Sequence, residues 1–301
     1  MAKFIGDAMV GVKGFLMGAA NVIPGVSGGT IALITGIYGR IIGSLNAFAS
    51  PSTWKLLFTR RWKEFWQAID GRFLLALGAG VVLSILSLAK LMEYVLSHYP
   101  IQTWAFFFGL IIASAVIMFR SIRHWSVKDV LFALAGIAIG VAVCTLTPTQ
   151  TPDSLLFVFI CGAIAVCSMI LPGISGSFVL VIMGKYDYIM QALDVTAFNI
   201  PVVAVFALGC GVGILAFAKF LHWLLGRWEQ QTMLVLLGFI IGSLIKVWPW
   251  ANMDAIEASQ GVAPGAPVEM HIAAAIIWCV VGIAFIAGIE LLGSKKKLEK
   301  Q

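Results

Sequence analysis

A short glycine-rich motif occurs twice in this chain and is its clearest candidate for chemistry. Pro24-Gly25-Val26-Ser27-Gly28-Gly29 recurs 148 residues later as Pro172-Gly173-Ile174-Ser175-Gly176-Ser177. Proline removes a backbone donor and glycine loosens the backbone, so each motif predicts a break between two helices. The helix after such a break presents free N–H groups and the positive end of its dipole. With nearby hydroxyl groups, this arrangement predicts an anion site, for which phosphate is the natural ligand.

The predicted anion contacts are the small and hydroxyl-bearing residues of the two motifs. They are Gly25, Ser27, Gly28, Gly29, Thr30, Gly173, Ser175, Gly176 and Ser177, with Asn21 as a weaker candidate. Small residues also let membrane helices pack closely, which is the structural alternative for one motif taken alone. Two motifs at matched positions in a duplicated chain favour substrate binding, because many transporters build a midplane site in this way.

Lys90 and Lys219 form a second candidate group. They match each other in Ala89-Lys90-Leu91 and Ala218-Lys219-Phe220. Both fall toward the ends of long apolar segments, so extension of the ammonium group to the membrane interface is the structural alternative. A cation within a membrane span is by default a functional hypothesis, and two equivalent lysines could neutralise a phosphate from opposite sides. The weaker cationic candidates are Arg40, Lys185 and Lys246.

The sequence offers little for catalysis or metal binding. The two motifs contain no Asp, Glu, His or Cys, and the chain has no HExxH sequence or P-loop. The five cysteines lie inside apolar runs without CxxC or histidine-partnered spacing, so neither a metal site nor a disulfide is predicted. We therefore predict translocation rather than catalysis, with no catalytic residue, metal ion or cofactor.

The composition requires that these residues be positioned by membrane helices. Of 301 residues, 60% are hydrophobic and 11% charged, whereas a soluble domain carries roughly a quarter charged residues. Residues 73–89, 101–119, 154–184 and 195–218 contain no charged side chain. Barrel strands would instead alternate over about 10 residues. The predicted fold class is thus an all-α integral membrane protein.

The motifs fall where a continuous span is impossible. As one helix, the uncharged run 154–184 would reach about 46 Å, against a hydrocarbon core of about 30 Å. It is too short for two spans and a turn, and Pro172-Gly173 lies in its middle. These constraints predict a re-entrant helical hairpin with the motif at its tip, and segment 8–49 is predicted to form the equivalent hairpin.

Each half of the chain is predicted to contain one re-entrant hairpin followed by three transmembrane helices. The six predicted spans are 72–97, 101–120, 128–147, 200–225, 231–248 and 271–291. Further matches join Gly109–Ser114 to Gly238–Ser243 and, more weakly, Gly136–Ala138 to Gly282–Ala284. The chain is predicted to cross the membrane three times between the two hairpins. Because this number is odd, the second half is inverted in the membrane relative to the first. Within a single transmembrane domain, 1–301, residues 1–148 form repeat 1 and residues 149–301 form inverted repeat 2.

Basic residues gather in alternate loops between these spans. Loops 97–102, 147–153 and 249–270 contain no Lys or Arg, whereas the other loops and the C-terminal segment are basic. Lysine and arginine concentrate on the cytoplasmic side of membrane proteins. This pattern predicts a multi-pass protein with both termini cytoplasmic, and it accounts for the net charge of +6 without a nucleic-acid partner.

Residues 18–30 and 169–178 resemble the bacterial polyprenyl-phosphate transporter family (PopT type), formerly a domain of unknown function. The resemblance covers essentially the whole chain. Members of that family return undecaprenyl phosphate from the outer to the inner leaflet of the cytoplasmic membrane, recycling the carrier for peptidoglycan synthesis. The resemblance implies that Ser27 and Ser175 hold the phosphate. Its pattern favours arginine near Lys219 and Lys246, where lysine keeps the charge but loses the bidentate fork.

The predicted mechanism is alternating access, with the phosphate between the two hairpin tips and the prenyl tail in the membrane lipid. One alternative is a small-anion exporter, which would share the tips but need no lateral opening. A less favoured alternative is an integral-membrane lipid-pyrophosphate phosphatase, whose hairpin motif should carry acidic residues and an arginine that Gly176-Ser177 does not supply. The coupling ion and the formation of a homo-oligomer are left open.

Overall fold

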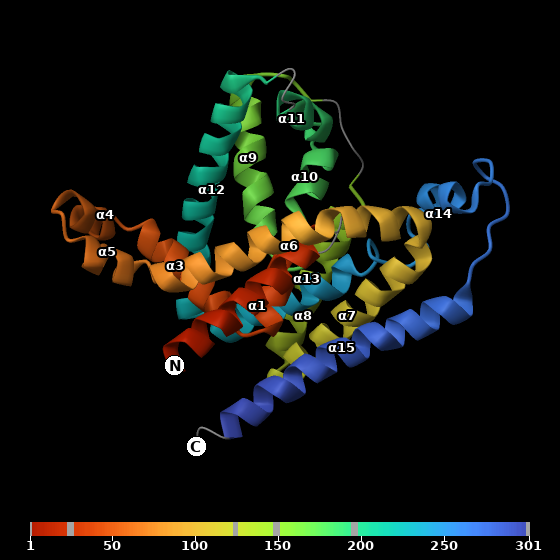
Figure 1. Cartoon of the computed structure of the whole chain (residues 1–301), viewed down its shortest axis with the longest axis horizontal. Helices are drawn as coiled ribbons and strands as arrows, with labels where there is room; N and C mark the ends of the chain where they lie inside the picture. The colour runs from red at the N-terminus through yellow and green to blue at the C-terminus, as the bar shows by residue number, and fades with distance from the viewer. Residues whose placement is uncertain (1, 23–26, 123–125, 147–150, 194–197, 299–301) are drawn as a thin grey trace. The chain divides into compact units, whose positions relative to one another are not determined.

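The fold is built from α-helices joined by turns (Figure 1). The computed structural model describes residues 2–22, 27–122, 126–146, 151–193 and 198–298, and no β-strand occurs among them. The helices are α1 (Ala2–Val22), α2 (Gly28–Ile34), α3 (Tyr38–Phe48), α4 (Pro51–Phe58), α5 (Trp62–Ala68), α6 (Gly71–His98), α7 (Pro100–Ser121), α8 (Val127–Cys144), α9 (Leu155–Ile170), α10 (Gly176–Ile182), α11 (Tyr186–Leu193), α12 (Ile200–Arg227), α13 (Glu229–Ser243), α14 (Met253–Gln260) and α15 (Ile272–Leu298).

Several helices are long and apolar enough to cross a membrane. Four pass this test within α6, α7, α8 and α12, and the α2–α3 pair, bent by 115°, is a possible fifth span. The expected all-α, multi-pass membrane fold is therefore confirmed. The helix predicted over 231–248 is shorter than expected, because α13 ends at Ser243. Pro249 lies a few residues beyond that end and cannot donate to a continuing helix.

The chain divides into two compact units. Unit 1 comprises Met1–Ile85 and Thr145–Met233, and unit 2 comprises Leu86–Cys144 and Leu234–Gln301. Each unit combines a segment from the first predicted half with a segment from the second. Both glycine–serine motifs belong to unit 1.

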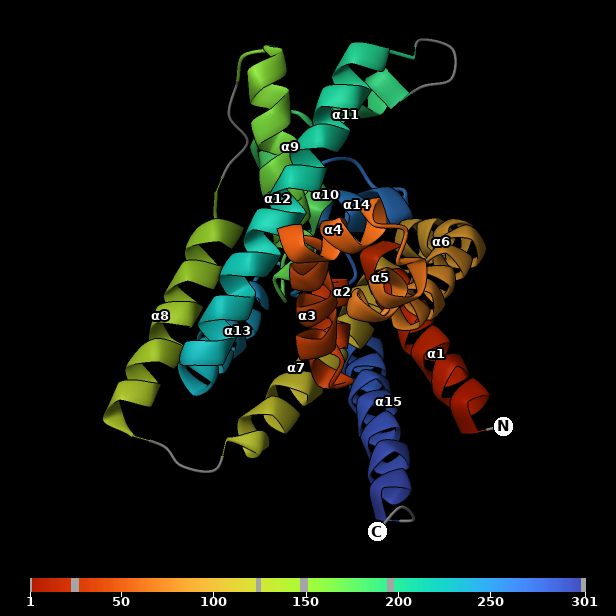
Figure 2. The ribbon, with the colours of Figure 1, turned by 90° about the vertical axis from the view of Figure 1, so that its left-hand side faces the viewer.

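Glycines bring the helices of unit 1 into close contact. α9 lies alongside α12 (Figures 1 and 2), where a side chain at Gly162 or Gly209 would collide with a backbone carbonyl of the facing helix. In the same way, Gly14 of α1 faces a carbonyl of α6, and Gly80 of α6 faces a carbonyl of α1. The first limb of each predicted hairpin is thus packed backbone to backbone against a long helix.

Glycines also bring two pairs of helices into close contact in unit 2. Gly109 of α7 and Gly282 of α15 each meet a carbonyl of the other helix. Gly136 of α8 and Gly238 of α13 do the same in the pair seen side by side in Figure 2. These contacts explain much of the glycine content within the apolar helices, since larger residues would force the backbones apart.

Candidate functional site

The first motif forms a capped helix start. Ser27 is the N-cap of α2, and its hydroxyl accepts a hydrogen bond from the Gly29 N–H at 3.1 Å. The Gly28 N–H donates to Oδ1 of Asn21 at 2.7 Å. Serine and asparagine side chains are well suited to satisfying free N–H groups at a helix start. Asn21 therefore connects the end of α1 to the start of α2, while Gly25 lies outside the described residues.

The second motif forms the matching break between α9 and α10. Ser175 is the N-cap of α10 and accepts from the Phe178 N–H at 3.2 Å, and its hydroxyl shares a hydrogen bond with that of Ser177. Gly173 has φ of +92°, a conformation that L-residues with side chains rarely adopt. The chain can turn sharply after α9 because glycine occupies this position.

The two motifs contact each other directly. The Ser27 hydroxyl lies 2.9 Å from the carbonyl oxygen of Leu171 and 3.2 Å from that of Met169 and donates toward both. In return, the Gly173 N–H donates to the hydroxyl of Thr30 at 3.0 Å. A side chain at Gly29 would collide with the Ile170 carbonyl, so the two breaks approach at backbone distance. Residues more than 140 positions apart in the chain thus form one cluster.

This cluster is largely closed to solvent. Ser27 is 0% exposed, Thr30 1% and Ser175 6%, whereas Ser177 is exposed. The hydroxyl of Ser27 is occupied by backbone carbonyls, and that of Thr30 by a backbone N–H. An anion can therefore reach these two hydroxyls only if the two breaks move apart.

Ser27 also stands in a Gly-x-Ser-x-Gly sequence, Gly25 to Gly29, a pattern that hydrolases use for a nucleophilic serine. In those enzymes the serine follows a strand and is hydrogen-bonded to a histidine. Here the described hydrogen bonds of Ser27 all involve backbone groups, and it precedes a helix in an all-helical region. No group of three or more His, Cys, Asp or Glu residues suited to a metal ion occurs among the described residues.

The candidate lysines do not lie together in one unit. Lys90 lies on α6 within unit 2, and Lys219 lies on α12 within unit 1. Both are exposed, as is Lys246, which follows α13 in unit 2. Their proposed contact with phosphate therefore stays a prediction.

Arg40 and Lys185 each have carboxylate partners. Arg40 forms a bidentate pair with Asp70, at 2.6 and 3.1 Å, and its guanidinium lies 4.1 Å from the ring centre of Phe73. The buried Lys185 donates to the Asp153 carboxylate at 2.6 Å and to the Thr151 carbonyl at 2.8 Å. These partners give both cations a structural role near the ends of the short helices.

The C-terminal ends of α2 and α10 are both held by side chains from preceding segments. Lys13 donates to the carbonyl of Thr35, the C-cap of α2, at 2.6 Å. The Thr151 hydroxyl donates to the carbonyl of Met183, the C-cap of α10, also at 2.6 Å. Sequence reasoning missed Lys13, although it is the one charged residue between Asp7 and Arg40.

The fold and the joined motifs define an all-α, multi-pass membrane protein with two paired glycine–serine helix breaks. The chain belongs to the VCA0040-like family, described as undecaprenyl phosphate translocase-like, whose model matches residues 17–263. The family predicted from the motifs is thus confirmed.

Two named relatives support this membership. A Vibrio cholerae serotype O1 protein named polyprenyl-phosphate transporter is 41% identical over 239 residues, covering 79% of this chain and 77% of the relative. A Staphylococcus aureus protein of the same name is 33% identical over 254 residues, covering 79% and 85% respectively. No solved structure matches the chain significantly.

Proposed function

We propose that this protein translocates polyprenyl phosphate, with undecaprenyl phosphate as the expected substrate, across the bacterial cytoplasmic membrane. The names of its relatives and the description of its family support this substrate class. Return of the carrier lipid to the inner leaflet would supply peptidoglycan synthesis. The substrate reaches the protein from the membrane, so membrane lipids are its immediate surroundings, and no nucleic acid is involved.

The direct contact between the two motifs is the observation that carries the proposed phosphate site. In the closed arrangement, Ser27 donates to carbonyl oxygens of the second motif, and Gly173 donates to Thr30. A phosphate between the separated tips would replace these acceptors with anionic oxygens. Hydrogen bonds to an anion are roughly twice as strong as those between neutral groups, so substrate binding would offset the loss of the tip-to-tip contacts.

The proposed alternating access depends on an inverted repeat. Four helix contacts support it, because matched glycines make matched contacts. Gly14 and Gly80 join α1 to α6 as Gly162 and Gly209 join α9 to α12. In sequence, α7 of the first half matches α13 of the second, and α8 matches α15. The α7–α15 and α8–α13 contacts are therefore equivalent to each other, and both are made by matched glycines. Two equivalent halves can supply two states of similar energy, one open to each leaflet.

The turns after α2 and α10 also match between the halves. Gly36 and Gly184 have φ of +70° and +62°, and each directly follows the C-cap residue of a seven-residue helix. We propose that α2 and α10 are the second limbs of the two re-entrant hairpins. During its passage, the phosphate would be neutralised by Lys90, Lys219 and Lys246. We also propose that both termini of the chain lie on the cytoplasmic side.

Reconstitution of the purified chain into vesicles tests this function. Labelled undecaprenyl phosphate should move between leaflets faster than in protein-free vesicles, without release of inorganic phosphate from undecaprenyl pyrophosphate. Competition by inorganic phosphate or sulfate as strong as that by the lipid phosphate would instead favour a small-anion exporter. Movement at the protein-free rate would contradict the proposal.

A further inference from the structure

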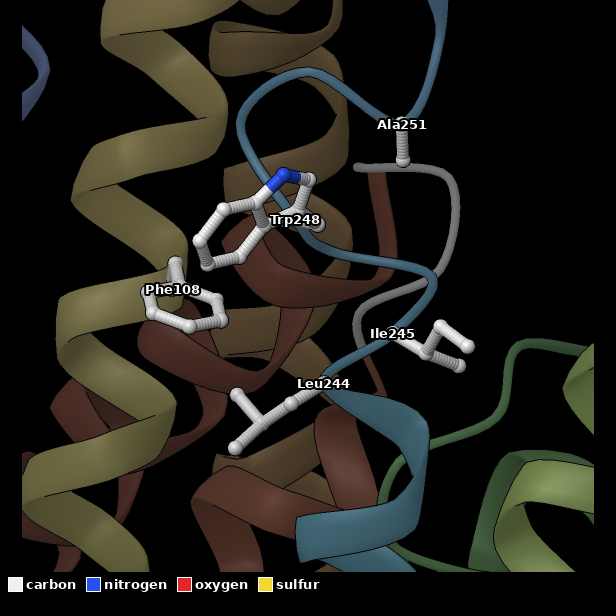
Figure 3. A pocket seen from close by; sticks show the side chains of 5 residues that line it. All are labelled: Phe108, Leu244, Ile245, Trp248 and Ala251. Carbon is white, nitrogen blue, oxygen red and sulfur yellow. The ribbon is translucent and has the colours of Figure 1, made fainter. Parts of the chain in front are cut away.

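An apolar pocket lies in unit 2. Its volume is about 530 Å³, and it is lined by Phe108, Leu244, Ile245, Trp248 and Ala251 (Figure 3). This volume falls within the range of about 300–1,000 Å³ that is usual for small-molecule sites. The five described residues that line it carry no charged side chain, so this part of the lining suits a hydrocarbon and not a phosphate.

The pocket lies where the two halves of the chain depart from their common pattern. Gly109–Ser114 of α7 matches Gly238–Ser243 of α13. α7 continues as a helix to Ser121, but α13 ends at Ser243, and the chain then runs through turns toward α14. A departure from an otherwise consistent local pattern is typical of a functional position. The unwound segment supplies four of the five lining residues in the described part of the chain.

Contacts within unit 2 hold the walls of the pocket. The rings of Phe108 and Trp248 meet edge to face with centroids 5.2 Å apart, and Trp248 lies 5.4 Å from Trp250. The indole N–H of Trp250 donates to the Met270 carbonyl at 3.0 Å, and its ring packs on a buried cluster that includes Ile101 and Ile256. A ligand would therefore meet a preformed surface, which reduces the entropic cost of binding.

A lysine stands next to one of the lining residues in the sequence. Lys246 follows the lining residue Ile245 and is exposed. An anionic head on a branched hydrocarbon tail would match this combination of charge and surface. We propose that the pocket binds isoprene units of a polyprenyl phosphate and that Lys246 attracts the phosphate of the same molecule. This inference rests on the proposed function and adds a tail-binding site to it.

Filling the pocket tests the inference directly. The full-length chain in nanodiscs is compared with Ala251→Trp and with the matched control Ala263→Trp, an exposed loop alanine outside the lining. Loss of contact with one or two isoprene units should weaken undecaprenyl phosphate binding by about 10-fold or more in Ala251→Trp. Ala263→Trp should bind like the wild type, and inorganic phosphate should bind both variants equally. Ala251→Leu, with a smaller side chain, should give an intermediate loss.

Photocrosslinking provides a second measurement, in a protein that keeps Ala251 and therefore leaves the pocket open. A photoreactive phenylalanine analogue at Ile245 should label undecaprenyl phosphate more efficiently than the same analogue at Ile276. These residues are 50% and 60% exposed, so exposure alone predicts no preference for position 245. Excess unlabelled undecaprenyl phosphate should suppress the label, whereas excess phosphatidylglycerol should not.

The outcomes separate this inference from the function on which it rests. If the wild-type chain fails to bind undecaprenyl phosphate, both the proposed function and the tail site are wrong. If the wild type binds but Ala251→Trp is unchanged, only the tail site is wrong. Suppression of the Ile245 crosslink by phosphatidylglycerol would also overturn it, because the pocket would then be a general lipid site.

Discussion

At the scale of single residues, the hydroxyl of Ser27 has one observed role and one proposed role. In the closed arrangement it donates to carbonyl oxygens of the second motif, and in the proposed substrate complex it would donate to phosphate. A hydrogen bond to a charged group contributes about 1.5–3 kcal/mol. Ser27→Ala and Ser175→Ala should therefore each weaken lipid-phosphate binding by about 10-fold or more. The affinity of each purified variant for undecaprenyl phosphate provides the measurement.

Ser44→Ala is the matched control for these variants. Ser44 is equally buried, but its hydroxyl donates to the carbonyl of Arg40 within α3. The control should bind like the wild type. Wild-type binding and transport in a Ser27→Ala, Ser175→Ala double variant would reduce both motifs to packing elements.

The exposed lysines allow a second prediction at the residue scale. Lys90→Met and Lys219→Met should each slow lipid-phosphate flipping by about 10-fold, because methionine keeps the apolar stem but not the charge. Lys→Arg at either position should retain most of the rate. The initial rate per reconstituted protein is measured alongside affinity, since a lysine that serves only one facing state would affect turnover more than binding. Unimpaired rates in both methionine variants would show that these lysines only extend to the interface.

At the scale of helices, glycine contacts determine how closely the elements approach. Gly209 of α12 faces the Phe159 carbonyl, whereas a side chain at Gly211, two residues along, would meet nothing within 4 Å. Gly209→Ala should destabilise the fold by about 1–3 kcal/mol, because α9 and α12 must separate. Gly211→Ala should be neutral or stabilising by up to about 1 kcal/mol, since alanine favours a helix. Thermal unfolding midpoints in detergent compare the pair, and equal midpoints would contradict the close α9–α12 contact.

At the scale of the whole molecule, loop charge and crossing number determine the predicted orientation. Single cysteines at positions 60 and 123 should react only from the cytoplasmic side, and those at 99, 150 and 260 only from the periplasmic side. The experiment uses a background in which all five native cysteines are replaced. Periplasmic labelling at position 123 would contradict the inverted repeat.

The sequence alone determined the membrane class, most helix positions and the family. These properties are local, because an uncharged apolar run specifies a spanning helix wherever it packs. The N-caps at Ser27 and Ser175 were similarly predictable, since serine satisfies free N–H groups within its own turn. The Gly238–Ser243 match likewise placed α13, but not the departure from helix after Ser243.

Only the tertiary structure decided which distant groups meet. The contact of Ser27 with Leu171, the Lys13 bond to Thr35 and the pocket beside Trp248 all join segments from different helices. Their formation depends on which faces of the helices pack together, and helical periodicity is weak in segments that are apolar on every side. The sequence therefore predicted two anion-binding tips, while the fold joined them and buried the hydroxyl groups of Ser27, Thr30 and Ser175.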